Sequence, residues 1–505
     1  MKKFCSFLVI TAAVMLAATC ASAAPRPEDL TSAFVNAGDW AAIGIRDVQA
    51  LVNEPADALL ARALKLLPAE QVKKYGDMAV AVDMRASLND ESDVDKVALA
   101  MEIKRTVTAD DFNDVPEFKA EDFAVTAPVG TTITSVGTVD TEEESLGLIY
   151  LANLERDGVK YLIGASSDPA NLAIMAAAAE NTPLARIHTP ANLCLQAQIS
   201  PESLSEMDIT ASLPFSMEIG IEDTPTSVKA ILWTNTVDEL NATLNKDLRA
   251  LFNGGTASKA PLTMGSPLAG LLNISASFLP KDFKLSDLID DADTVKEIEE
   301  EVDETLSAVG LEWSDLVKVL RGNVTLGIAG TLEAPLVGTF PGLCLHLSDM
   351  DSAKATTLIA MLTEQMKGLG SEPDNYNADG WKGSIFSAPV SLLLAHGEKG
   401  MILAGMNADN FGQTPQIAPA LAPAVEPRNF ALAFDVKALQ PALKALFDAF
   451  GDTLDDEDDK EIASMVLDNI STLNALSLVS IDADTFVLEV VPDPAKIDTL
   501  LPAAQ

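Results

Sequence analysis

The chain has few of the residues on which catalysis and nucleic-acid binding commonly depend. Among its 505 residues there are three histidines, four cysteines and only 5% aromatic residues. Acidic residues outnumber basic ones by 75 to 34, so the formal net charge is −41. This charge repels the phosphates of nucleic acids and anionic lipid headgroups, and no basic cluster counters it. We therefore predict that the chain binds no nucleic acid.

Long apolar runs are absent beyond the N-terminus, which has the pattern of an export signal. Two lysines precede an apolar stretch at 7–18, and the small residues 21–23 form a cleavage motif. We predict a signal peptide at 1–23, cleaved near Ala23, and a periplasmic or extracellular mature protein. Lipid attachment at Cys20 is the weaker alternative, because the residue before it is larger than usual. With no later run near the ~20 residues that cross a bilayer, no integral membrane segment is predicted after signal removal.

Two cysteines remain after the predicted cleavage. Cys194 and Cys344 each lie within an apolar strand pattern. An oxidising compartment permits a disulfide between them, whereas a buried cysteine also behaves as a small hydrophobic residue. We favour two unpaired, buried thiols over the disulfide. The spacing excludes a CxxC redox or zinc site.

The main feature that is present is a repeat. Residues 192–204 (NLCLQAQISPESL) return as residues 429–439 (NFALAFDVKAL), and each copy alternates as a strand before a polar residue suited to cap a helix. Other strand and hairpin patterns recur in the same order, including a hairpin that turns at Asp157-Gly158. Because a repeat of this length is too long for a solenoid, we predict an internal duplication.

Strand and helix patterns are mixed without a strict alternation. Helical spacing predicts amphipathic helices at 295–309, at 437–450 and after Asp351. The weakly patterned segment 110–144 is expected to hold loops and a short edge strand. The mixture predicts an α+β fold of two tandem homologous lobes, each a mainly antiparallel β-sheet packed with amphipathic helices.

The lobe boundaries follow from composition. We expect lobe 1 at 24–255 and lobe 2, its duplicate, at 256–505. The linker is expected within residues 253–267, which are rich in Gly, Ser and Pro.

No cluster of residues meets the requirements of a catalytic or metal site. The three histidines, His188, His346 and His396, are isolated, and none recurs in the other lobe. They lack the HExxH or His-x-His spacing that places two nitrogens on one metal. We therefore predict surface or structural roles for them. No catalytic, cofactor-binding or metal-binding residue is assigned, and no cofactor is predicted.

Three other stretches resemble parts of functional sites without completing them. GxSxG, GxxxxGK[ST] and GxGxxG motifs are absent, so residues 166–168 (SSD) are interpreted as a turn or cap. Residues 375–380 have the opening spacing of an EF-hand loop, but its twelfth position is Phe386, where calcium needs a carboxylate, so we predict a polar loop. The acidic run 455–459 is interpreted as favourable charge at a helix N-terminus, with weak cation binding as the alternative.

These observations favour an exported, non-enzymatic binding or interaction protein of the cell envelope. Its expected partner is an unknown protein or an apolar small molecule, and one version is a carrier that holds an apolar ligand between a sheet and amphipathic helices. The first alternative is a hydrolase whose site assembles from dispersed residues, which requires ionisable groups that converge in a pocket. The second is a structural component of envelope assembly, which requires an exposed apolar patch or sheet edge.

Overall fold

A computed structural model of the chain describes most of residues 24–496. The residues within this range that it does not describe are 53–68, 89–93, 116, 142–146, 181, 183–185, 207–210, 225, 239–241, 243–267, 282, 288, 290, 308–309, 335–337, 379, 388–390, 399, 406–416, 451–471 and 494. The predicted signal peptide, the linker at 253–267, the predicted lobe boundary and the acidic run 455–459 therefore lie outside the described residues.

Antiparallel β-structure dominates the fold. Strands account for 42% of the structure and helices for 28%, and the described strands pair with their neighbours in antiparallel ladders. The predicted fold class, two α+β lobes that each pack a sheet with amphipathic helices, is therefore wrong. The prediction undercounted strands that carry polar residues on both faces, because such strands lack the apolar alternation that identifies a half-buried strand.

Two segments illustrate this error, one expected to hold loops and a short edge strand and the other expected to be a polar loop. Within 110–144, residues Thr131–Asp140 (TTITSVGTVD) form a ten-residue strand. The polar residues Pro373–Ala378 (PDNYNA), which contain most of the EF-hand-like spacing, form another. Both pair in hairpins, so the backbone ladder rather than side-chain burial defines them.

Contacts divide the chain into two compact units, residues 1–222 (unit 1) and 223–505 (unit 2). The helices of unit 1 are α2 (Pro27–Phe34), α3 (Val48–Val52), α5 (Ala69–Met78), η1 (Ala109–Phe112), α6 (Asn171–Ala176) and α7 (Pro201–Glu206). Its strands are β1 (Asp39–Ile45), β2 (Ala79–Leu88), β3 (Val94–Ile103), β4 (Phe118–Lys119), β5 (Thr131–Asp140), β6 (Leu148–Arg156), β7 (Val159–Ser166), β8 (Leu193–Ile199) and β9 (Phe215–Asp223). They pair in the order β9-β8-β1-β2-β3-β7-β6-β5-β4.

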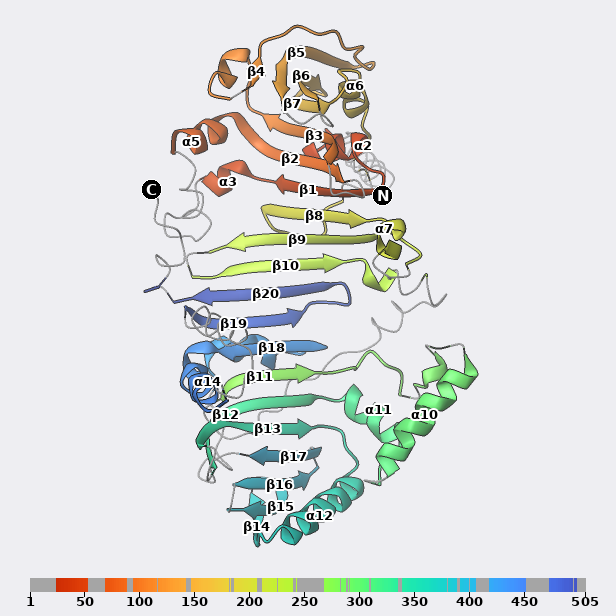
Figure 1. Cartoon of the computed structure of the whole chain (residues 1–505), viewed down its shortest axis with the longest axis vertical. Helices are drawn as coiled ribbons and strands as arrows, with labels where there is room; N and C mark the ends of the chain where they lie inside the picture. Colours follow the sequence, from red (N-terminus) through yellow and green to blue (C-terminus); the bar gives the residue numbers. More distant parts are fainter. Residues whose placement is uncertain are drawn as a thin grey trace, which may run out of the picture. The chain divides into compact units, whose positions relative to one another are not determined.

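Unit 2 contains longer helices. They are η3 (Leu285–Asp287), α10 (Ala292–Ser307), α11 (Trp313–Arg321), α12 (Ser352–Gly368), η5 (Pro419–Leu421), α13 (Ala422–Val425) and α14 (Val436–Phe450). The strands are β10 (Val228–Thr234), β11 (Leu268–Ile274), β12 (Val324–Ala334), β13 (Gly338–Leu347), β14 (Pro373–Ala378), β15 (Trp381–Phe386), β16 (Leu392–Gly397), β17 (Gly400–Gly405), β18 (Phe430–Asp435), β19 (Leu473–Ser480) and β20 (Thr485–Pro492). Figure 1 shows their order, β10-β20-β19-β18-β11-β12-β13-β17-β16-β15-β14, with α12 beside the β14 end.

The two units share one strand order. Each strand from β9 to β4 has a counterpart numbered ten higher at the same place in the run from β19 to β14. This agreement supports the proposal that one unit arose by duplication of the other.

Local sequence explains where elements begin and turn. Asp157 and Gly158 adopt φ values of 51° and 79°, the two positive values that a tight turn between β6 and β7 requires. The carboxylate of Asp351 accepts hydrogen bonds from the backbone N–H groups of Ala353 and Lys354, at 2.9 and 3.1 Å, and so caps α12. The predicted hairpin and the predicted helix after Asp351 are confirmed.

Helices cover parts of both faces of the strands. In unit 1, α2 and α6 contribute Leu30 and Leu172 to a core that includes Trp40. In unit 2, η5 and α13 bring Leu421 and other apolar residues against β11, β18 and β19. α12 packs against β16 and β17 through a second cluster, which consists of Val319, Met350, Ala355, Leu358, Ile359, Phe386, Leu394 and Met401.

Candidate functional site

Two of the three histidines lie in unit 2, on opposite faces of the strands. His346 is fully buried on β13, with its ring edge-on to Trp381 at 5.5 Å between centroids. Its cross-strand neighbour Ile402 pairs in turn with Ala395, so these three residues share a face. Because successive strand residues alternate, the next residue, His396, faces the other way. The two imidazoles therefore cannot act on one substrate atom.

The third histidine, His188, is an exposed residue of unit 1. Its backbone N–H donates to the carboxylate of Glu218. Within the described ranges, no group of three His, Cys, Asp or Glu side chains is placed to hold a metal ion. The hydrolase alternative thus gains no support from these residues.

The two cysteines are free and buried, as we favoured from the sequence. Burial raises the pKa of the Cys194 thiol, and it raises the pKa of the Cys344 thiol to about 12. A thiol held protonated in this way is a poor nucleophile and a poor metal ligand. Both cysteines therefore act as small core residues.

The remaining motif-like stretches have structural roles. Ser166 Oγ accepts a hydrogen bond from the backbone N–H of Val97 at 3.0 Å, and Asp168 Oδ1 accepts one from that of Ala170 at 2.7 Å. These bonds define a turn, as predicted for residues 166–168. Residues 375–378 pair with β15 instead of forming a cation-binding loop.

A buried charged cluster in unit 1 was not predicted. Its members are Glu28, Asp29, Asp83, Arg85 and Glu218, which are all at least nine-tenths buried. The alternating stretch VAVDMRASL contained a usable signal, because Asp83 and Arg85 are two apart in a strand and so share a face. Charged residues on the covered face of a strand indicate a buried pair.

Small neighbours make room for the two charged side chains of β2. Asp83 is flanked across the strands by Gly44 and Ala100, and Arg85 by Ala42 and Ala98. A Cβ at Gly44 would lie 3.1 Å from Asp83 Oδ1, so the absence of a side chain there leaves space for the carboxyl group. The register of the strands therefore places small residues beside the charged ones and leaves room for the cluster.

Contacts among four elements, β2 itself and three others, hold Arg85 and Asp83 in place. The guanidinium of Arg85 lies 4.0 Å from the centroid of a Trp40 ring and donates to Gln196 Oε1 at 3.3 Å. The Thr31 hydroxyl, on α2, donates to Asp83. Because these contacts come from α2, β1, β2 and β8, the cluster fixes the N-terminal helix on the sheet.

The cluster extends along one cross-strand row to β9. Arg85, Ala42, Gln196 and Glu218 are successive partners in this row. Gln196 Nε2 donates to Glu218 Oε2 at 2.9 Å, and the backbone N–H of Thr189 donates to Glu218 Oε1 at 2.7 Å. Glu218 thus closes the far end of the row.

Burial also determines how the cluster responds to pH. Burial raises the pKa of Glu28 above its ordinary value, although Arg26 lies 3.0 Å away. A raised pKa means that folding binds protons, so stability is fully present below the ordinary carboxyl pKa and is lost as pH rises through the folded value. We expect wild type to lose stability relative to Glu28→Gln as pH rises above the ordinary glutamate pKa, because the pKa of Glu28 is raised in the folded state. Urea unfolding at several pH values measures the difference, and parallel pH curves for the two proteins would contradict the assignment.

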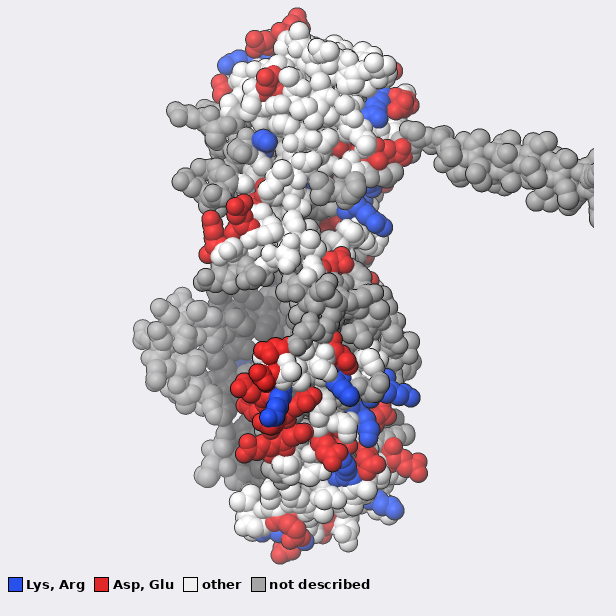
Figure 2. Space-filling view, turned by 90° about the vertical axis from the view of Figure 1, so that its right-hand side faces the viewer, with Lys and Arg blue, Asp and Glu red and all other residues white. Residues whose placement is uncertain are grey.

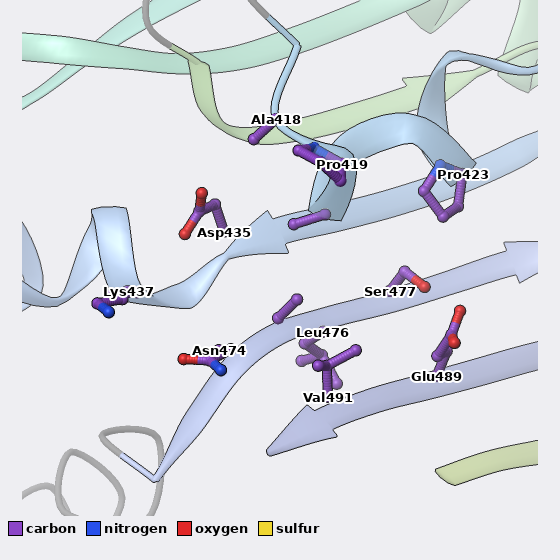
Figure 3. Close-up of a pocket in the computed structure, with 12 residues that line it drawn as sticks. Ala418, Pro419, Pro423, Asp435, Lys437, Asn474, Leu476, Ser477, Glu489 and Val491 are labelled. Carbon is purple, nitrogen blue, oxygen red and sulfur yellow. The ribbon is translucent and has the colours of Figure 1, made fainter. Parts of the chain in front are cut away.

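Among the described residues of unit 2 there are two well-formed pockets whose lining does not include the charged cluster. The first has a volume of about 470 Å³ and lies between η5, α13, the start of α14 and strands β19 and β20 (Figure 3). The second, of about 460 Å³, is lined by Ser352 at the start of α12 and by residues of β15, β16 and their adjoining turns, including His396. His396 Nδ1 lies 3.2 Å from Thr356 Oγ1 there.

A row of leucines crosses six strands of unit 2. Its successive cross-strand partners are Leu488, Leu478, Leu432, Leu272, Leu326 and Leu345. We call the face that carries this row the apolar face. Leu488 is 36% exposed, and Ile274 and Leu343, each two residues from the row on the same face, are 38% and 50% exposed. A corresponding row in unit 1 includes Met84, Ile43 and Leu195, all exposed to a similar degree.

Comparisons with protein families, curated proteins and solved structures found no match for this chain. Within the part of the chain that the structure describes, none of the helices combines the length and apolar character needed to cross a membrane.

Proposed function

We propose that the protein is an exported, non-enzymatic binding protein whose apolar face docks an apolar segment of a partner protein in the cell envelope. The observation that carries this proposal is the leucine row of unit 2. Six neighbouring strands span roughly 25 Å, and aligned, partly exposed apolar side chains over such a width are typical of interaction surfaces.

The charge of the chain and the shape of the apolar face indicate which kind of partner binds there. The net charge of −41 disfavours anionic lipid headgroups. Figure 2 shows acidic side chains gathered on the face that carries α10, whose sequence ADTVKEIEEEVDETLS contains seven acids and one lysine. A broad row on a sheet suits the apolar stripe of a helix, whereas the two pockets mix polar and apolar lining residues. These features support a protein partner over an enclosed apolar ligand.

The direct test measures binding of a neutral amphipathic helix. We expect the full chain to bind a fluorescein-labelled peptide with a Leu stripe and Gln and Ser elsewhere, measured by fluorescence anisotropy. Placing two lysines on the apolar face, Leu432→Lys with Leu478→Lys, should weaken binding by about tenfold or more, because two charges would be desolvated. Leu369→Lys is the matched control, because Leu369 is 79% exposed and lies just after α12.

Vesicles of zwitterionic lipid provide the competing probe. If the protein binds these vesicles and ignores the peptide, the partner is a lipid surface and the proposal is wrong. Equal peptide affinity in the double variant and in the Leu369→Lys control would also exclude the apolar face as the peptide-binding site. Thermal unfolding monitored by circular dichroism verifies that both variants remain folded.

A further inference from the structure

The first pocket of unit 2 combines a strand floor, a proline wall and a β-bulge. Its floor is formed by β19 and β20, including Ser477 and Val491, and Pro419 and Pro423 form one wall. The register of β19 and β20 slips between Leu473 and Ala475, so Asn474 is not matched with a residue of β20 in the strand register, although its side-chain Nδ2 donates to the Pro492 carbonyl at 3.3 Å. Such a bulge redirects a side chain, and bulges are common next to functional sites. Here it accompanies an Asn474 side chain that lines the pocket.

Two polar groups of the pocket can still form hydrogen bonds or ion pairs with a ligand. Ser477 is 6% exposed, and its hydroxyl has no hydrogen-bond partner among the described residues. Lys437, near the start of α14, forms no ion pair within the same described part of the chain. Asp435, in contrast, already caps α14 by accepting a hydrogen bond from the Ala438 N–H at 3.0 Å. A ligand group that hydrogen-bonds the Ser477 hydroxyl in the pocket takes the place of water there.

Charges of opposite sign occupy the two ends of the pocket. Figure 3 shows Lys437 and Asn474 at one end and Ser477 and Glu489 at the other. The Glu489 carboxylate is 3.9 Å from Lys229 Nζ, at the outer limit of an ion pair, and its side chain is 27% exposed. It can therefore accept further hydrogen bonds from a cation. Because the Asp435 carboxylate also lies at the Lys437 end, that end carries one charge of each sign, whereas Glu489 lies at the other end.

We propose that this pocket binds a short apolar peptide of about three residues through its free termini. The ammonium group meets Glu489 and Ser477, the carboxylate meets Lys437 and Asn474, and the side chains lie against the prolines. The length follows from the strand, because Asn474 and Ser477 are three residues apart, which is roughly 10 Å. An extended tripeptide spans about the same distance, whereas a single amino acid does not. The volume of about 470 Å³ is within the usual range for small-ligand sites.

Calorimetric titration of the full chain with the tripeptide Leu-Ala-Leu tests the proposal. We expect saturable binding, and blocking the amine by acetylation or the carboxylate by amidation should each weaken it about fivefold, as for a partly exposed ion pair. Glu489→Gln should weaken binding of the free peptide and leave the acetylated peptide unchanged. Lys437→Met should weaken binding of the free peptide and leave binding of the amidated peptide unchanged.

Lys444→Met is the matched control, because Lys444 is an exposed lysine on α14 that does not line the pocket. Its affinity for the tripeptide should equal that of wild type. The proposal is overturned if millimolar tripeptide produces no binding heat, or if the blocked peptides bind as well as the free one. Because the apolar face is not involved, the Leu432→Lys and Leu478→Lys pair should retain tripeptide binding, which separates this test from that of the proposed function.

Discussion

Replacing Arg85 by methionine is expected to lower the free energy of unfolding by about 3–5 kcal/mol. Arg85 is fully buried, stacks on Trp40 and is the positive charge that most strongly lowers the pKa of Asp83. Burial already raises the pKa of Asp83, and Arg85 opposes that effect. Without the guanidinium, the fold must keep a buried carboxylate without its counter-charge or protonate it. Either outcome favours the unfolded chain.

Urea unfolding at neutral pH measures this loss, with Arg105→Met as the matched control. Arg105 also pairs with an aspartate, Asp111, at 2.5 Å, but its side chain is 52% exposed. We therefore expect the control to cost no more than about 1 kcal/mol. Adding Asp83→Asn to Arg85→Met should restore part of the stability, because it removes the charge left behind. Similar losses for Arg85→Met and Arg105→Met would show that the buried pair has no special role.

The strands that could be predicted from the sequence are those with one apolar face. β8, β18 and the β6–β7 hairpin fall where alternation and the Asp157-Gly158 turn place them. β5 and β14 could not be found in this way, because many of their residues are polar and it is pairing with the next strand, β6 or β15, that defines them. Helical stripes are easier to detect than such strands. This difference explains why the helices received too much weight in the predicted fold class.

The candidate surfaces were hidden from sequence reasoning for a different reason. The leucine row joins Leu272, Leu432 and Leu488, which are far apart in the sequence, and only the register of the strands aligns them. The pocket similarly depends on the bulge at Asn474. The charged cluster was accessible in principle through the spacing of Asp83 and Arg85. The inclusion of Glu218 in this cluster was not accessible, because β9 contributes it from a distant part of the sequence.

Phe386→Ala is expected to lower the free energy of unfolding by about 3–5 kcal/mol. Phe386 ends β15, is fully buried and packs in the cluster that joins α12 to the sheet. Removing its ring leaves a cavity that neighbours such as Leu358, Ile359 and Leu394 cannot fill, because α12 and the strands hold them in place. The loss should therefore include the energy of the cavity as well as the lost burial.

Calorimetric unfolding together with amide hydrogen exchange measures the effect and locates it. Amides of α12, β15 and β16 should lose protection in Phe386→Ala, because they surround the cavity. Leu369→Ala is the control, because Leu369 follows α12 directly but is 79% exposed, and a change of less than about 0.5 kcal/mol is expected. If Phe386→Ala costs no more than this control, α12 is not anchored through the cluster, and the packing of this end of unit 2 must rest on other contacts.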